Sequence, residues 1–261
     1  MDTPTVLDIE GSRATLAFNR DDARNALSLE LLASAHEHLD ELAGTTQGTK
    51  GTGGTGGTGG IKVLTLTGSG RAFCAGMDLK QVLDGDETPR RLLESLARLT
   101  IKLRSLPMVV IGAVNGAAIG GGCGIACVCD LAITHADAKL GFPEVDLGLC
   151  PAVVAPWVVR KVGGGRARAI LLAGGTMSGT DAHAMGLVDR LVDSREELMP
   201  AADALAESIA GGGERALAAT KGLLNELDGS LDESVVLRGA ALSADVLSQP
   251  EAQEILRARL R

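Results

Sequence analysis

One glutamate stands alone in an apolar stretch of the chain. Glu144 directly follows Pro143 in the segment FPEVDLGLCPAVVAPWVVRKVG, residues 142–163. A carboxylate in such a setting either caps the helix that follows it or works as an acid/base, because burial raises the pKa of a carboxyl group. Glu144 is therefore the first candidate for a residue that moves protons.

Two glycine-rich turns could stabilise a negatively charged oxygen. Three consecutive glycines from Gly120 precede a predicted helix in NGAAIGGGCG, residues 115–124, and a second turn, GSGRAFCAGMDL, residues 68–79, runs into another predicted helix. The first N–H groups of a helix have no intrahelical acceptor, and glycine leaves them uncovered. Spacing alone predicts two places where an anion could form. We expect Asp78 in the second turn to cap its helix.

The elements that must position these turns alternate between strands and helices in the first two thirds of the chain. Alternating apolar residues predict a hairpin of residues 5–9 and 14–18, then strands over residues 61–67, 109–114, 131–134 and 138–140. Helical spacing predicts helices over residues 29–42 (with Ser28 as N-cap), 90–106, 121–129, 164–173, 178–185, 198–209, 214–227 and 231–247. This order predicts an α/β core followed by a helical tail whose apolar faces need a partner.

The central stretch, residues 107–130, holds 23 residues without a charge before Asp130. That length suits a membrane span, but the Asn115-Gly116 turn and the glycine triplet interrupt it. We interpret it as a buried strand and a buried helix, with Asp130 bonded to backbone groups at the helix end. The amino-terminal residues have neither a basic segment nor an apolar one typical of a signal peptide, so a cytoplasmic protein without a membrane partner is expected.

Composition disfavours several other classes of function. Aromatic residues make up 2% of the chain, tyrosine is absent and the formal net charge is -8, which argues against nucleic-acid binding. The five cysteines match no zinc spacing, so no metal site is expected. Residues 44–60 formally contain G-x-G-x-x-G, but they follow a helix and precede a strand, so we expect a flexible Gly/Thr-rich loop and no dinucleotide.

Four blocks together resemble the enoyl-CoA hydratase/isomerase (crotonase) family. They are GRAFCAGMDL, NGAAIGGGCGIACVCD, FPEVDLGLCP and AMGLVDRLV, and the resemblance runs in order over about residues 5–247. It implies a crotonase-like α/β core of ββα units in a spiral at residues 1–194. It also implies a C-terminal helical region at residues 195–261 that assembles a homotrimer or homohexamer. The substrate would be an acyl-CoA thioester, with coenzyme A entering only as part of it and no further cofactor.

The resemblance also assigns roles to residues. By motif position, the backbone N–H groups of Met77 and Gly121 would form the oxyanion hole that holds the thioester oxygen, with Glu144 as the catalytic acid/base. Residues implied at the substrate and coenzyme A are Arg24, Ala26, Ala75, Gly76, Asp78, Leu79, Gly120 and Pro143. Lys221, in an A-x-x-x-K-x-x-L helix pattern, would either meet a phosphate or lie solvated on the surface.

The chain departs from the two-glutamate hydratases of this family. Gly124 stands where their first catalytic glutamate follows the triplet, so Glu144 is the single carboxylate; we expect Asp146 to point away from it and to be structural. The P-A-V-x-x-P segment resembles the branch of hydratases that acts on methylglutaconyl-like esters, and Ala152 disfavours dienoyl-CoA isomerisation. We therefore expect a hydratase of a short or branched enoyl-CoA, a lyase of fatty acid metabolism. The alternatives are a Δ3,Δ2-enoyl-CoA isomerase and a non-catalytic acyl-CoA-binding homologue.

Overall fold

A six-stranded sheet forms the centre of the protein. The computed structural model describes residues 3–47, 60–83 and 87–259. The strand order is β1-β2-β3-β5-β7-β10, with β1 Thr5–Glu10, β2 Arg13–Phe18, β3 Val63–Gly68, β5 Val109–Val114, β7 Leu131–His135 and β10 Arg190–Val192. The β1–β2 pair is antiparallel, which confirms the predicted hairpin, and every later pair is parallel.

A smaller four-stranded sheet lies at the carboxyl ends of these strands. Its order is β4-β6-β8-β9, with β4 Ala72–Cys74, β6 Ala117–Ile119, β8 Lys139–Gly141 and β9 Thr176–Ser178. The chain repeatedly enters the large sheet, continues into the small sheet and then forms a helix, as in β5, β6 and α4 (Gly121–Val128). This repetition is the spiral of ββα units that the resemblance implies.

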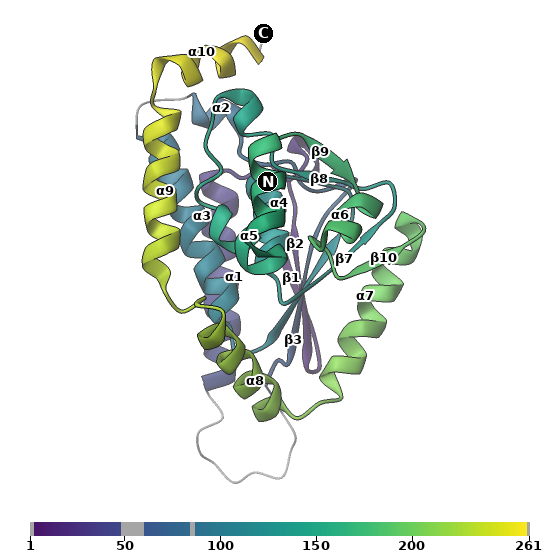
Figure 1. The fold of residues 1–261 in the computed structure, drawn as a ribbon. Coiled ribbons are helices and arrows are strands. Elements are labelled where there is room, and N and C mark those ends of the chain that lie inside the picture. The colour runs from purple at the N-terminus through teal and green to yellow at the C-terminus, as the bar shows by residue number, and fades with distance from the viewer. Residues whose placement is uncertain (1–2, 48–59, 84–86, 260–261) are drawn as a thin grey trace.

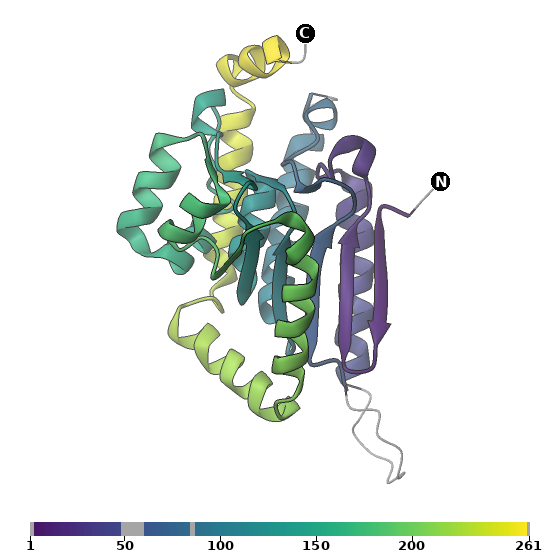
Figure 2. The ribbon, with the colours of Figure 1, turned by 90° about the vertical axis from the view of Figure 1, so that its right-hand side faces the viewer.

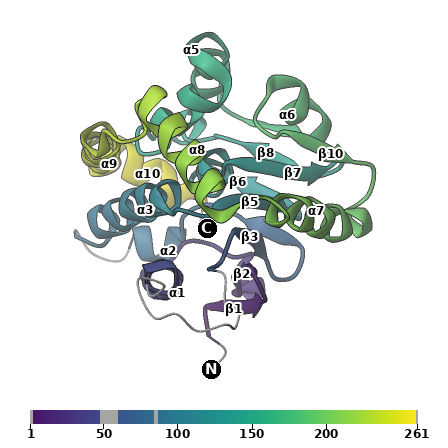
Figure 3. The same ribbon diagram turned by 90° about the horizontal axis from the view of Figure 1, so that it is seen from below.

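Helices cover both faces of the large sheet. Figure 3 shows α1 and α3 on one side of it and α7 on the other, and Figure 2 looks onto the α7 side. The longer helices are α1 Leu29–Gln47, α3 Thr88–Ser105, α5 Ala155–Ala173, α7 Arg195–Ala210, α8 Glu214–Leu227, α9 Glu233–Leu247 and α10 Pro250–Arg259. The short ones are α2 Leu79–Val82 and α6 Gly179–Met185, with single 3-10 turns at Asp21–Ala23 and Val145–Leu147.

Two hydrophobic cores follow from this layering. Leu198, Ala202 and Leu205 of α7 pack on Ile111 and Ile133 of the large sheet. The main core lies on the other side of the sheet and includes α1, α3, α4 and α9. Figure 1 shows α9 running alongside α3 at the outer edge of this layer. The C-terminal third therefore completes the core as well as extending it.

The uncharged central stretch does not form a membrane helix. It divides into β5, the short β6 and the eight-residue α4, all largely buried. Within the described part of the chain, every helix is too short or too polar to cross a bilayer. Burial inside a folded domain thus explains the missing charges.

Several boundaries differ from those predicted. Helix α1 runs on to Gln47, so the start of the expected Gly/Thr-rich loop at residues 44–60 is helical, while residues 48–59 lie outside the described residues. Helix α5 begins at Ala155 and is interrupted at Gly163, whose φ of 79° and ψ of 158° are not helical. Helix α10 and the strands β4, β6, β9 and β10 were not predicted.

Candidate functional site

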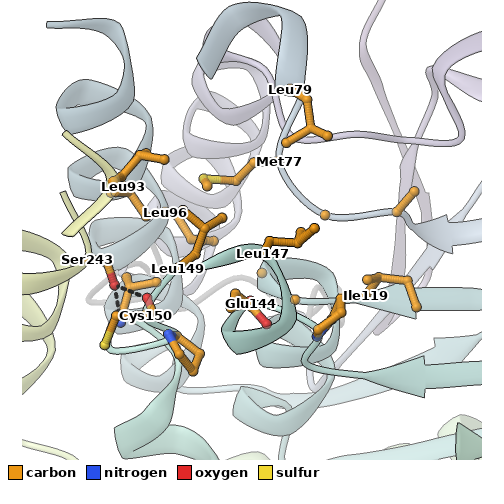
Figure 4. Close-up of a pocket in the computed structure, with 18 residues that line it drawn as sticks. Met77, Leu79, Leu93, Leu96, Ile119, Glu144, Leu147, Leu149, Cys150 and Ser243 are labelled. Carbon is orange, nitrogen blue, oxygen red and sulfur yellow. Dashed lines mark hydrogen bonds between the residues drawn. The ribbon is translucent and has the colours of Figure 1, made fainter. Parts of the chain in front are cut away.

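One cavity of about 120 Å³ collects most of the residues implied at the site. Both glycine turns and the glutamate segment reach it: its lining includes Ala75, Gly76, Met77, Leu79, Gly120, Gly121, Pro143 and Glu144. The remaining wall comes from α3, from the segment after Glu144 and from α9. Figure 4 shows side chains of these three parts around Glu144: Leu93, Leu96, Leu147, Leu149, Cys150 and Ser243. Two segments predicted to stabilise an anion therefore face the predicted acid/base.

The glycine-rich turn at residues 68–79 directs the Met77 N–H away from the neighbouring Leu27. Leu27 pairs with Met77 in an isolated parallel bridge. The Leu27 N–H donates to the Gly76 carbonyl at 2.8 Å, and the Asp78 N–H donates to the Leu27 carbonyl at 2.9 Å. Because N–H groups alternate in direction along an extended segment, the Met77 N–H points to the opposite side. Met77 lines the cavity, so this donor is available there.

The turn with the glycine triplet places the start of α4 at the same cavity. Gly120 has φ 54° and ψ -118°, a backbone conformation that favours glycine. A Cβ at Gly120 would lie 2.6 Å from Oε1 of Glu144, so the glycine also leaves room for the carboxyl group. Gly121 is the first residue of α4, and its N–H has no acceptor within the helix.

The Glu144 carboxyl group is held in an apolar environment. It does not cap the 3-10 turn that it precedes, and its Oε2 is buried without a hydrogen-bond partner. Burial raises the pKa of Glu144 to about 7, and hydrogen bonding to its own backbone offsets this only in part. Of the two interpretations open from the sequence, the geometry thus excludes capping and is consistent with an acid/base near neutral pH.

A valine fills the space where a second carboxylate could enter. A Cβ built on Gly124 would lie 2.1 Å from Cγ1 and 2.6 Å from Cβ of Val154, which is fully buried. Any side chain at position 124 therefore requires Val154 to move. Asp146 does not compensate, because it is exposed and its Oδ2 accepts a hydrogen bond from the Gly175 N–H at 2.8 Å.

Three residues implied at the substrate do not line this cavity: Arg24, Ala26 and Asp78. Arg24 is exposed and has a φ of 52°. The Ala26 carbonyl accepts a hydrogen bond from the Arg20 guanidinium at 2.7 Å. Asp78 caps α2 through the Lys80 N–H at 3.2 Å, which confirms the predicted cap, and also pairs with Arg20 at 3.1 Å. These contacts are structural, and they border the turn that carries Met77.

Known proteins match this chain along almost its whole length. The sequence model described as enoyl-CoA hydratase/isomerase matches residues 8–254. The chain belongs to this family. A putative enoyl-CoA hydratase of Thermus thermophilus is 34% identical over 95% of this chain and 94% of its own. A crotonyl-CoA hydratase of Syntrophomonas wolfei is 29% identical over 95% of this chain and 92% of its own.

Solved structures agree with this assignment. The crystal structure of an enoyl-CoA hydratase from Mycobacterium avium superimposes with a TM-score of 0.83 at 25% identity, covering 100% of this chain and 97% of that one. The fold is therefore the crotonase fold, and the chain is an enzyme of the enoyl-CoA hydratase/isomerase family, which acts on acyl-CoA thioesters.

Lys221 of this hydratase/isomerase homologue does not lie solvated on the surface. Its side chain is 6% exposed, pairs with Asp130 at 2.7 Å and donates to the Met108 carbonyl at 2.9 Å. Burial lowers the pKa of Lys221, and Asp130 opposes this. Asp130 also accepts from the Val110 N–H at 2.8 Å, which confirms its predicted backbone role. Lys221 therefore fastens α8 to the end of α4 and the start of β5.

Sequence reasoning did not identify which residues of α9 reach the site, Ser243 and Leu247. The Ser243 hydroxyl donates to the Cys150 carbonyl at 2.7 Å and accepts from the Val153 N–H at 3.2 Å. One turn earlier, a Cβ at Gly239 would lie 2.2 Å from the Ala152 carbonyl oxygen. The spacing of four between this glycine and serine was the available signal for a helix face in close contact with another segment.

The buried thiols do not form a metal centre. Among the described residues, no three His, Cys, Asp or Glu side chains come together as metal ligands. Burial raises the pKa of Cys74 and of Cys129 to about 12, so both thiols stay protonated at neutral pH.

Proposed function

We propose that the protein is an enoyl-CoA hydratase that adds water across the 2,3 double bond of an enoyl-CoA thioester. The observation that carries this proposal is the position of the Glu144 carboxyl group. It lies in one apolar cavity with the two turns that present the N–H groups of Met77 and Gly121. Its pKa of about 7 lets the same group accept and donate a proton near neutral pH.

The proposed reaction uses each of these groups. The thioester oxygen accepts hydrogen bonds from Met77 and Gly121, which draws electrons from the conjugated double bond. Glu144 takes a proton from water as the water oxygen bonds to C3, and the C2=C3 π electrons form an enolate. Glu144 then returns the proton to C2. Stabilising the enolate oxygen with one such donor is worth about 3–4 kcal/mol in related sites.

A second candidate, Δ3,Δ2-enoyl-CoA isomerase, is supported by the Gly124–Val154 contact. Because Val154 occupies the space beside Gly124, the described lining of the cavity offers a single carboxyl group. Moving one proton from C2 to C4 through an enolate needs only one such group and no water. The two reactions differ in the fate of the conjugated thioester.

An absorbance assay with crotonyl-CoA tests the proposal. Hydration removes the conjugated-thioester absorbance, and Glu144→Gln should slow this loss by about 10²-fold or more. Glu94→Gln, which changes an exposed glutamate of α3, is the matched control. If the wild type causes no loss of absorbance, hydration is contradicted. A gain of absorbance with 3-butenoyl-CoA would then indicate the isomerase. No change with either substrate would indicate a binding protein.

The Gly121 donor can be tested with a matched pair of variants. Gly121→Pro deletes the N–H at a helix position that tolerates proline. Gly121→Ala adds a Cβ that meets the flexible ends of Leu27 and Leu96 at 3.0 Å but keeps the N–H. We expect kcat of the proline variant to fall about 10²–10³-fold below that of the alanine variant. Equal kcat values would remove Gly121 from the oxyanion hole.

Assembly into a homotrimer or homohexamer in the cytoplasm is part of the proposal. Helix α8 exposes Leu223, Leu224 and Leu227, at 56%, 56% and 73%, and Leu231 follows it at 60%. Such a patch is typical of a protein–protein interface. The five cysteines are free, which suits a reducing compartment. Light scattering after size-exclusion chromatography would test assembly, and a mass of one chain would refute it.

A further inference from the structure

Among the described residues, the wall of the cavity is apolar except at Glu144, Cys150, Ser243 and the backbone turns. Six aliphatic side chains from three elements form it: Leu93 and Leu96 of α3, Leu147, Leu149 and Val153 after Glu144, and Leu247 of α9. No lysine, arginine or histidine is among the described residues that line the cavity. Glu144 carries the one carboxyl group among these described residues. An acyl chain that extends from the thioester therefore meets mainly hydrocarbon and no cationic side chain among these residues.

Polar groups at the edge of this wall already have partners. The Ser243 hydroxyl is bonded to the Cys150 carbonyl and the Val153 N–H. Arg90, at the start of α3, pairs with Asp245 of α9 at 3.0 Å on the surface. Neither group is placed to neutralise a charge inside the cavity.

We propose that the acyl group is an uncharged hydrocarbon chain, and that the site rejects acyl chains of the same length that end in a carboxylate. The inference rests on the proposed function in taking this cavity as the acyl site. A distal carboxylate would lose its hydration without gaining a hydrogen bond or a cation. It would also meet the negative charge of ionised Glu144. A methyl end gains instead from apolar burial.

This assignment separates the protein from the hydratase branch that its P-A-V-x-x-P segment resembles. Methylglutaconyl esters carry a distal carboxylate. In the structure, Pro151 and Val153 of that segment line the cavity, with Val154 beside them against Gly124, and none of these residues offers a donor to such a carboxylate. The resemblance therefore extends to the backbone of this segment and not to the charge of the acyl group.

The test compares hexanoyl-CoA with adipyl-CoA, which have six carbons each and differ in a terminal methyl against a carboxylate. Both are saturated, so isothermal titration calorimetry at pH 8 measures binding without turnover. We expect hexanoyl-CoA to bind at least about 10²-fold more tightly, a difference of about 2.7 kcal/mol. Equal affinities, or tighter binding of adipyl-CoA, would overturn the inference.

A charge added to the wall should reduce the preference. Leu147 is half-buried, so a lysine there can keep its ammonium group hydrated at the cavity edge. We expect Leu147→Lys to lower the hexanoyl/adipyl affinity ratio at least about 10-fold, whereas Leu147→Met, of similar size, keeps the ratio. The same ratio in both variants would contradict selection by charge at this wall.

The assays separate failure of the inference from failure of the proposed function. Preference for hexanoyl-CoA together with no change of crotonyl-CoA would support the acyl class and refute hydration. Hydration of crotonyl-CoA together with equal binding of the two saturated esters would support the proposed function and refute the inference about the acyl group.

Discussion

Replacing Glu144 with glutamine should stabilise the protein above neutral pH, although it removes the proposed acid/base. The Glu144 pKa is about 7 in the folded protein, against an ordinary value of 4.5. Between these values the folded protein holds a proton that the unfolded chain has released, so stability falls as pH rises through this window. Above pH 7 the wild type carries a buried charge, at a cost of about 3 kcal/mol.

The glutamine variant keeps the shape of the neutral carboxyl group and never ionises. Its stability should match that of the wild type near pH 4.5 and exceed it by about 3 kcal/mol at pH 8.5. For a chain of this length, that difference corresponds to a rise in Tm of roughly 6–12 °C. The other titrating groups are shared by the two proteins, so their contributions cancel in the comparison.

Thermal melts followed by circular dichroism, at one protein concentration and from pH 5 to pH 8.5, would measure the difference. Glu94→Gln reports what loss of an exposed carboxylate does on the same scaffold. A stability difference for Glu144→Gln that is constant over this range would refute the reasoning, because the carboxyl group would then titrate alike in the folded and unfolded states.

Three further predictions follow from the same geometry. The kcat/KM of the wild type should rise with pH as Glu144 loses its proton around pH 7 and level off above it; a pH profile that stays flat through 7 would contradict a base role. Gly124→Val should lower stability to urea by about 1–3 kcal/mol through overlap with Val154, and Val154→Ala should restore most of it in the double variant. Lys221→Met should lower the free energy of unfolding by about 3–5 kcal/mol, because it breaks the buried pair with Asp130. In urea denaturation, strict additivity of the losses in Lys221→Met and Asp130→Asn would show that the pair is not coupled.

The long elements of the fold could be predicted because their periodicity is strong. The hairpin, β5, α3 and α8 all appear close to their predicted positions. Strands β4 and β6 have three residues each, and alternation cannot be recognised over so short a run. They are strands because neighbours from distant parts of the chain pair with them.

Hydrophobic patterning predicts the extent of α8 but does not give its orientation. Pattern reasoning turns leucine inward and lysine outward, but this helix buries Lys221 and Asn225 and exposes Leu223, Leu224 and Leu227. The buried lysine is compensated by Asp130, more than 90 residues away in sequence, which no local pattern reports. The Glu144 segment was easier to single out, because a carboxylate in an apolar run is a local signal.

The attachment of α9 to the cavity wall has a consequence for how the enzyme matures. Ser243 joins Cys150 across 93 residues, and Leu247 faces the cavity with Leu93. A ribosome makes the chain from the amino end, so the glutamate segment is complete long before the helix that holds it. Until α9 docks, this apolar groove has no cover on that side and is open to wrong partners. A chain that ends before residue 233 would lack this wall and should therefore bind the acyl group poorly.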